Sequence, residues 1–313
     1  MSKVCFTADQ HIKLGQKNVP RDWQRSRFML LAAELNKYGC DYHVFGGDLL
    51  DVSNPSLEEV GLMYDFLQAI DKPVVMISGN HELSTKTLDC YRFIDNMLTD
   101  LGVRVIRDFT HHDGIDYIPY NILHKASWGS PQSSIAVTHV RGEIPPHVTP
   151  EIDLTRFEAY DTVFAGDLHS YTNSQGILRY PGSPFSTSFH RSVPTGANGV
   201  FLIDTDTGNY SWDELYLPQL VRKRVKSSEE MVQTPFHHTI YELEGSLDEL
   251  SAVSNSELLD KKITVDISTP ATLQLEGDLS EELAVFLKDI KNMSESEVAE
   301  FVTLFKEIVR DTD

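Results

Sequence analysis

The fold is decided by the stretch Tyr42-His43-Val44-Phe45-Gly46-Gly47-Asp48, in which a short apolar run ends at two glycines and an aspartate. A second stretch of the same kind follows along the chain, Val74-Val75-Met76-Ile77-Ser78-Gly79-Asn80-His81. Between them, residues 56–70 have the apolar spacing of a helix, and Ser56 with Glu59 fits a capping box at its start. A strand, a helix and a second strand in this order predict parallel strands in an α/β architecture.

The same kind of pattern continues on both sides of this unit. Residues 3–8 are predicted to form a short buried strand, and residues 22–38 a helix that ends at Gly39. From residue 103 to residue 217 strands predominate, and they are expected at 104–106, 115–118, 134–139, 162–165, 199–204 and 210–217. Residues 205–209 are typical of a hairpin turn between the last two. We therefore expect a layered α/β core, with β-sheets flanked by helices.

Three segments are expected along the chain. The core domain is predicted over residues 1–220, and the basic run 222–226 is interpreted as a linker. Residues 227–275 suggest a small strand–helix–strand capping domain, and residues 279–313 suggest terminal helices. In the last helix Ser294 and Glu297 fit a capping box, and Phe301 and Phe305 lie on one apolar face. That face either packs on its own domain or binds a partner protein.

The composition is typical of a globular protein. The chain has 313 residues, of which 41% are hydrophobic and 24% charged, so collagen-like and disordered classes are excluded. No stretch approaches the roughly 20 apolar residues of a membrane span, and the first residues lack a signal peptide's apolar core. The three cysteines are odd in number and widely spaced, which suits reduced thiols. We expect a cytoplasmic protein without membrane contact, in the host cytoplasm if a phage encodes it.

The net charge of −20 is unevenly distributed. Residues 227–313 hold 20 acidic and 6 basic side chains, a net charge of −14, which leaves −6 for residues 1–226. The acidity therefore belongs mostly to the C-terminal part and does not exclude DNA binding by the front part.

Residue types that bind metals follow the predicted strands at once. They are Asp9 and His11, Asp48, Asn80 with His81 and Glu82, His139, and Asp167 with His169. Because ligand sites gather beyond the carboxyl ends of strands in α/β sheets, we expect these side chains to meet. Each motif alone has a plainer explanation, such as a helix cap, a turn or a core histidine. Together they predict a site for two divalent cations that share a bridging aspartate.

This ordered set resembles the signature of the calcineurin-like metallophosphoesterases. Within that superfamily, Gly47-Asp48-Leu49-Leu50-Asp51 and Tyr180-Pro181-Gly182-Ser183-Pro184 are similar to the SbcD-type nuclease branch, which includes phage recombination nucleases. The resemblance covers residues 3–217. It implies one ion bound by Asp9, His11, Asp48 and His169, and a second bound by Asp48, Asn80, His139 and the residue at position 167.

The chain departs from the family pattern at Asp167, where relatives usually have histidine. An aspartate there favours hard cations, so we expect Mn²⁺, with Mg²⁺ as the alternative. The alternative interpretation is that Asp167 points away from the site and that the second ion binds weakly. The resemblance also implies that His81 contacts the scissile phosphate or protonates the leaving group.

A group of basic residues follows Asp9 and His11 and could neutralise a DNA backbone: Lys13, Lys17, Arg21, Arg25 and Arg27. Their alternative interpretation is a solvated helix face. Gly182 would permit close approach of a nucleic-acid strand, or simply form a tight turn.

The resemblance implies a two-metal DNA nuclease that works with a coiled-coil ATPase of the SbcC type. The ATPase would bind helices of the tail, and the nuclease would form a homodimer within the complex through helices of the front part. Two alternatives stay open: a phosphatase or phosphodiesterase with a small or protein substrate, and a non-catalytic scaffold.

Overall fold

The structure is a computed structural model that describes residues 2–232, 236–245, 250, 251, 253, 256, 258–263, 279–291 and 293–310. It has two compact units, Met1–Leu243 with Val253–Lys261, and Glu244–Ala252 with Lys262–Asp313. Residues of the predicted 227–275 domain fall in both units, so the three predicted segments stay a prediction. Part of that segment, 264–275, lies outside the described residues.

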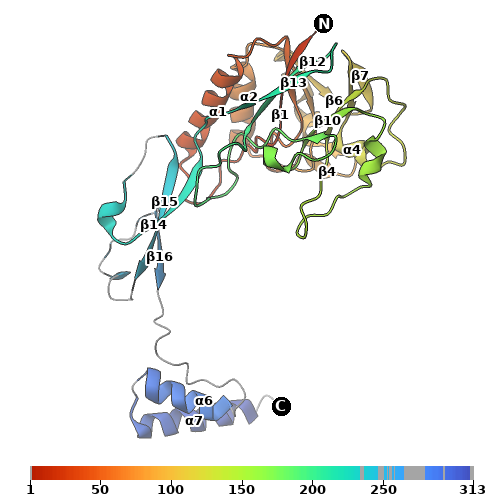
Figure 1. Ribbon diagram of the computed structural model, residues 1–313. Helices are drawn as coiled ribbons and strands as arrows, with labels where there is room; N and C mark the ends of the chain where they lie inside the picture. Colours follow the sequence, from red (N-terminus) through yellow and green to blue (C-terminus); the bar gives the residue numbers. More distant parts are fainter. Residues whose placement is uncertain are drawn as a thin grey trace. The chain divides into compact units, whose positions relative to one another are not determined.

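Two β-sheets form the body of the first unit (Figure 1). The six-stranded sheet has the order β13-β12-β1-β2-β3-β6, with β1 at Lys3–Thr7, β2 at Tyr42–Phe45, β3 at Val74–Ile77, β6 at Val103–Ile106, β12 at Gly199–Asp204 and β13 at Tyr210–Glu214. The five-stranded sheet has the order β11-β10-β9-β8-β7, with β7 at Thr110–His112, β8 at Ile115–Ile118, β9 at Ile135–His139, β10 at Thr162–Gly166 and β11 at Leu178–Arg179. Strands β1, β2, β3 and β6 run parallel, as do β8, β9, β10 and β11, whereas β12 and β13 form an antiparallel hairpin.

The two sheets pack face to face. Successive side chains of a strand point to opposite faces, so one strand contributes to two buried clusters. On β1, Val4 and Phe6 join a buried cluster with Val137 and Phe164 of the other sheet, whereas Cys5 belongs to a second cluster formed with the helices. A third cluster covers the outer face of the five-stranded sheet. The predicted layered α/β core is confirmed.

Helices α1 (Arg21–Leu35) and α2 (Leu57–Gln68) lie together on the outer face of the six-stranded sheet (Figure 1). Helix α1 begins after Pro20, whose fixed φ suits an extended residue before a helix. Helix α2 begins after Ser56, whose side chain accepts a hydrogen bond from the backbone N–H of Glu59, while the Glu59 carboxylate accepts from the backbone N–H of Ser56. The predicted capping box is therefore present.

Short elements connect these layers. They are β4 (Leu83–Thr85), β5 (Leu88–Asp89), α3 (Asp95–Asp100), α4 (Tyr120–Leu123) and 3₁₀ turns at Cys90–Ile94, Leu154–Phe157, Tyr171–Asn173 and Ser228–Glu230. Strands β4 and β5 form a hairpin directly after His81 and Glu82, so this hairpin begins at the edge of the predicted site.

The predicted linker at 222–226 is wrong, because most of it belongs to strand β14 (Leu220–Val225). Strand β14 pairs in parallel with β15 (His238–Gly245), which is followed in the sheet by β16 (Leu259–Ile263). Arg222 donates hydrogen bonds to Glu242 and Asp260 of these two strands. Cross-strand carboxylates neutralise the basic run and allow it to pair within a sheet.

The second unit contains helix α6 (Leu279–Val285), a π-helical turn (Phe286–Ile290) and helix α7 (Glu295–Arg310), and α6 packs against α7. The backbone N–H and the hydroxyl of Ser294 both donate to the Glu297 carboxylate at the start of α7. The first of these bonds is one of the two that the predicted capping box requires. Val298 is buried, whereas Phe301 and Leu304 are about half exposed. Among the residues described, no helix is long and apolar enough to cross a membrane.

Candidate metal centre

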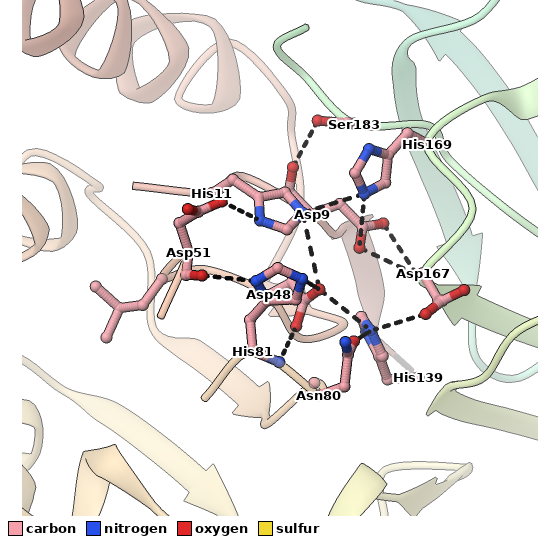
Figure 2. Close-up of polar contacts among 12 residues, drawn as sticks. Asp9, His11, Asp48, Asp51, Asn80, His81, His139, Asp167, His169 and Ser183 are labelled. Carbon is pink, nitrogen blue, oxygen red and sulfur yellow. Dashed lines mark hydrogen bonds and ion pairs between the residues drawn. The ribbon is translucent and has the colours of Figure 1, made fainter. Parts of the chain in front are cut away.

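The predicted ligands lie where parallel strands end. Asp9 follows β1, Asp48 follows β2 and Asn80 follows β3, while His139 ends β9 and Asp167 follows β10. Because β1, β2 and β3 are neighbours in one sheet and β9 and β10 are neighbours in the other, their carboxyl ends meet at one edge of the sandwich. Figure 2 shows the resulting cluster, in which imidazoles and carboxylates from both sheets point toward one another.

The backbone at this edge is strained. Across the part of the chain that the structure describes, six residues other than glycine have positive φ angles, and four of them are predicted ligands: Asp9 (60°), His11 (49°), Asp48 (54°) and Asp167 (97°). Such conformations cost about 1–3 kcal/mol each and persist only when the surroundings impose them. Hydrogen bonds between the loops impose them here, since the backbone N–H of Asp9 donates to Gly47 and that of His11 donates to Asp48.

Asp48 lies at the centre of the cluster. Its Oδ2 atom is 3.5 Å from Nε2 of His139, 3.7 Å from Nε2 of His11 and 3.8 Å from Nε2 of His81. Burial would raise the pKa of the Asp48 carboxyl, but the nearby imidazoles outweigh burial and lower it. A carboxylate that faces imidazoles on several sides can serve as a bridge between two cations.

His11 and His169 approach each other closely. Their Nε2 atoms lie 3.1 Å apart, and Nε2 of His169 is 4.0 Å from Oδ1 of Asp9. Two imidazole lone pairs at this distance repel unless a proton or a cation lies between them. Neutral imidazole and carboxylate are the donors that divalent transition metals take in proteins.

His139 also lies where a proton or a cation would be stabilised. Its Nδ1 atom lies 2.9 Å from the carbonyl oxygen of Gly46, which only accepts, so Nδ1 carries the hydrogen. The other nitrogen, Nε2, faces Oδ1 of Asn80 at 3.0 Å as well as Asp48. Burial alone would lower the pKa of His139, but Asp48, Asp9 and Asp167 raise it well above its ordinary value.

His81 stands at the open side of the cluster, with 38% of its side chain exposed. Nδ1 donates to the carbonyl oxygen of Asp51 at 2.6 Å, and the backbone N–H of His81 donates to Oδ1 of Asp48. These two bonds fix the ring and leave Nε2 directed at the cluster (Figure 2).

Three glycines make room for these side chains. A Cβ atom at Gly47 or Gly166 would lie 2.6 Å from Nδ1 of His139, and one at Gly79 would lie 2.1 Å from Oδ1 of Asp48. Gly47 also has a φ of +96°, which favours glycine. The glycines of the sequence motifs are therefore needed by the geometry of the cluster.

Glu82 forms hydrogen bonds with the two loops that follow β2 and β3. Its buried carboxylate accepts hydrogen bonds from the backbone N–H groups of Asp48, Gly79 and Leu50 and from the hydroxyl of Tyr91. Burial raises the pKa of Glu82, and the charge of Asp48 raises it further. This carboxylate positions the Asp48 and Asn80 loops relative to each other.

The donor set fits divalent cations. Three overlapping groups each bring their ligand atoms within 4.8 Å of one another: Asp9, His11 and His169; His11, Asp48 and His81; and Asp9, Asp48 and His139. Asp9, His11 and Asp48 each belong to two of these groups, which suits two ions with common ligands.

Comparisons with known proteins agree with this chemistry. A family model described as calcineurin-like phosphoesterase matches residues 2–171, and the chain is 44% identical over 322 aligned positions to probable exonuclease subunit 1 of Escherichia phage T5, with 99% of each chain covered. The chain belongs to the calcineurin-like phosphoesterase family. The predicted family is confirmed.

Two more distant likenesses accompany this family assignment. The SbcD component of the nuclease SbcCD from Staphylococcus epidermidis is 34% identical over 86 residues, which cover 26% of this chain and 23% of that protein. The solved structure of an archaeal phosphodiesterase is 14% identical and has a TM-score of 0.39, covering 68% of this chain and 99% of its own.

Asp167 is the position at which this calcineurin-like phosphoesterase has a carboxylate in place of the expected imidazole. Its Oδ1 atom lies 4.0 Å from Nε2 of His139, and its backbone N–H donates to Asp9. Both of its oxygens accept hydrogen bonds from the guanidinium of Arg141. Coordination by Asp167 stays a prediction, and Arg141 is a residue that the sequence did not single out. The one signal for it is its place two positions after His139.

The predicted DNA-binding residues of this family member are spread over different environments. Lys13 donates to Asp51 beside His11, Arg21 pairs with Glu58, Arg25 lies 4.0 Å from Asp65, and Lys17 is exposed. Arg27 is buried, with its guanidinium against the rings of Phe185, Trp23 and Phe28. The structure therefore does not place Arg27 where a DNA backbone could reach it.

Gly182 is buried as well. With a φ of +81°, it lies where a Cβ atom would be 1.9 Å from the carbonyl oxygen of Ala197. Packing alone explains this glycine, and a contact with DNA stays a prediction. The neighbouring Ser183 donates to the carbonyl oxygen of Asp9 and so anchors the turn to the site (Figure 2).

Proposed function

We propose that this chain is the nuclease subunit of an SbcC/SbcD-like complex and that it hydrolyses phosphodiester bonds of DNA with two divalent cations. The observation that carries the proposal is the position of Asp48, whose Oδ2 atom faces Nε2 of three imidazoles within 3.8 Å. A carboxylate between two groups of ligands is the arrangement that a two-metal phosphodiesterase requires.

We assign the ligands to two ions. Asp9, His11, Asp48 and His169 would hold the first, and Asp48, Asn80, His139 and Asp167 would hold the second. The three carboxylates and one amide favour Mn²⁺, with Mg²⁺ as the alternative. When bound, such ions polarise a phosphodiester and lower the pKa of a water ligand to near neutrality.

His81 is the proposed catalytic residue. Its Nδ1–H is held by the carbonyl oxygen of Asp51, so Nε2 is the atom that can hold a proton for the departing oxygen. The ring is exposed on one side, where a substrate can approach. Proton transfer of this kind contributes roughly 10²–10⁴-fold to a rate.

The choice of DNA and of a partner rests on the relatives and on charge. The phage T5 relative is named as an exonuclease subunit, and the more distant one is a subunit of SbcCD. Lys13 pairs with Asp51 beside His11. The proposed backbone contacts are Lys13, Lys17, Arg21 and Arg25. We assign helix α7, with Phe301 and Leu304 half exposed, as the docking element for a coiled-coil ATPase in the cytoplasm. A homodimer of this chain within the complex is part of the same proposal.

The test is cleavage of a short single-stranded DNA and of a linear duplex by the purified chain, with Mn²⁺, Mg²⁺ or a chelator. The expected result is cleavage of the single strand that requires Mn²⁺ and falls about 10²–10⁴-fold in His81→Gln. The same assay with bis(p-nitrophenyl) phosphate separates the alternatives. Turnover of this small ester with intact DNA would favour a small-substrate phosphodiesterase, and two bound ions without turnover of either would favour a scaffold.

A further inference from the structure

The carboxylate of Asp167 is held by an arginine in a fork. Nε of Arg141 donates to Oδ2 at 2.9 Å, and Nη2 donates to Oδ1 at 3.0 Å. Asp167 is nearly buried, with 5% of its side chain exposed, whereas 43% of the Arg141 side chain is exposed. Two parallel charge-assisted bonds fix the plane of a carboxylate as well as its position.

The same carboxylate also faces the candidate metal centre. Oδ1 lies 4.0 Å from Nε2 of His139, which lies 3.0 Å from Oδ1 of Asn80 and 3.5 Å from Oδ2 of Asp48. Figure 2 shows Asp167 on the side of the cluster occupied by Asn80 and His139. Both oxygens of the carboxylate thus meet Arg141, and Oδ1, which has a second lone pair, also lies beside His139.

Arg141 is itself fixed by its neighbours. Its backbone N–H donates to Oε1 of Glu151 at 3.2 Å, and Oε2 of Glu151 accepts from the hydroxyl of Tyr120 at 2.7 Å. The ring of Tyr120 packs edge-on against His139, with 5.9 Å between the ring centroids. A connected set of contacts therefore joins Arg141 to a ligand residue by two routes, through Asp167 and through Glu151 and Tyr120.

The Asp167–Arg141 pair also sets the net charge at position 167. A neutral imidazole at position 167 would add no charge to the site, whereas a lone carboxylate would add a third negative charge beside Asp9 and Asp48. The guanidinium of Arg141 returns the sum at this position to zero. A ligand that is hydrogen-bonded from outside also keeps one orientation, and such outer partners typically change metal affinity by about 10–100-fold.

We propose that Arg141 is a positioning residue that orients Asp167 as a ligand of the second cation and cancels its charge, so that the pair takes the place of a neutral imidazole. The inference rests on the proposed two-metal function but concerns ion binding, which is measured without any DNA.

The experiment is a double-mutant cycle read out by Mn²⁺ titration calorimetry of the metal-free full-length chain. Arg141→Gln is expected to weaken the second Mn²⁺ about 10–100-fold where residue 167 is Asp. In the Asp167→His background the same change should alter the affinity by less than about threefold, because an imidazole cannot occupy the fork. Arg141→Lys keeps the charge but not the fork, so its affinity for the second Mn²⁺ should lie between those of wild type and Arg141→Gln. Arg191→Gln, which removes an exposed arginine that lies 3.7 Å from Glu242 of β15, is the matched control.

Two other results of the cycle, and one result for the wild type, would overturn the inference. An equal loss in both backgrounds would mean that Arg141 supports the fold without acting through Asp167. Unchanged or tighter binding in Arg141→Gln would mean that Arg141 does not support coordination, and a wild-type chain that binds one ion would remove the second site. If wild type binds two ions and the cycle behaves as expected but no DNA is cut, the proposed function fails and this inference stands.

Discussion

Gly79→Ala tests whether the metal centre depends on close packing between its loops. A Cβ atom at position 79 would lie 2.1 Å from Oδ1 of Asp48 and 2.7 Å from Cε1 of His139. Ordinary contact begins at 3.4 Å, so the Asp48 carboxylate has to move by roughly 1.3 Å. Asp48 cannot move freely, because Oδ1 also accepts from the backbone N–H of His81. A displacement of about 1 Å in a catalytic site costs on the order of 10²-fold in rate.

We therefore expect Gly79→Ala to cleave a phosphodiester at least about 10²-fold more slowly than wild type. We also expect it to bind Mn²⁺ more weakly than wild type. Overpacking should also lower the free energy of unfolding by about 1–3 kcal/mol. Gly61→Ala is the matched control, because Gly61 lies within helix α2 and a Cβ atom there would meet nothing within 4 Å. That change should stabilise the protein by about 0.5–1 kcal/mol.

The assays are Mn²⁺ titration calorimetry, phosphodiester cleavage and thermal unfolding of both variants without metal. For domains of this size, 1 kcal/mol corresponds to a shift in Tm of about 2–4 °C, so the two variants should shift in opposite directions. If Gly79→Ala bound Mn²⁺ and cleaved substrate as well as Gly61→Ala does, the packing argument for the site would be refuted.

Three further predictions concern the buried acids and the tail. Glu82→Gln should lower the free energy of unfolding by about 2–3 kcal/mol, because an amide cannot accept from three backbone N–H groups, whereas Glu58→Gln in an exposed ion pair should cost less than about 1 kcal/mol in urea denaturation. Burial raises the pKa of Asp9 to about 7, so in the metal-free chain Asp9 holds a proton below that pH, and its contribution to stability is lost as the pH rises from about 4 to 7. Mn²⁺ displaces that proton, so calorimetry should show weaker binding and proton release at about pH 6 than at about pH 8, and a pH-independent affinity would contradict the assignment. Deletion of residues 294–313 should abolish binding to the ATPase partner in a pull-down and leave cleavage of a short single strand intact, whereas loss of both would make α7 part of the fold.

Much of the fold follows from short local patterns. Strands β2 and β3 lie where their apolar runs predict them, and α2 begins after the predicted cap at Ser56. Strand β7 (Thr110–His112) was not predicted, because His111 and His112 carry no β-strand pattern. The interpretation of residues 222–226 as a linker failed because the carboxylates that pair with Arg222 come from Glu242 and Asp260, far along the chain.

The candidate site divides in the same way. Asp9, Asp48 and His139 could be predicted because each stands at the carboxyl end of a strand, where ligand sites of α/β sheets gather. The pairing of Arg141 with Asp167 could not, since it depends on how two loops of the second sheet face each other. Arg27 follows the basic pattern of its neighbours in the sequence, but Phe185 from a distant turn covers its guanidinium. The residues that could not be predicted are those whose role depends on side-chain direction, which tertiary packing determines.

The most direct measurement is anomalous diffraction at the manganese edge from crystals of the full chain grown with Mn²⁺. We predict two peaks about 3.5–4 Å apart, with the carboxylate of Asp48 between them and Oδ1 of Asp167 beside the second. A single peak, or two peaks that do not share Asp48, would contradict it.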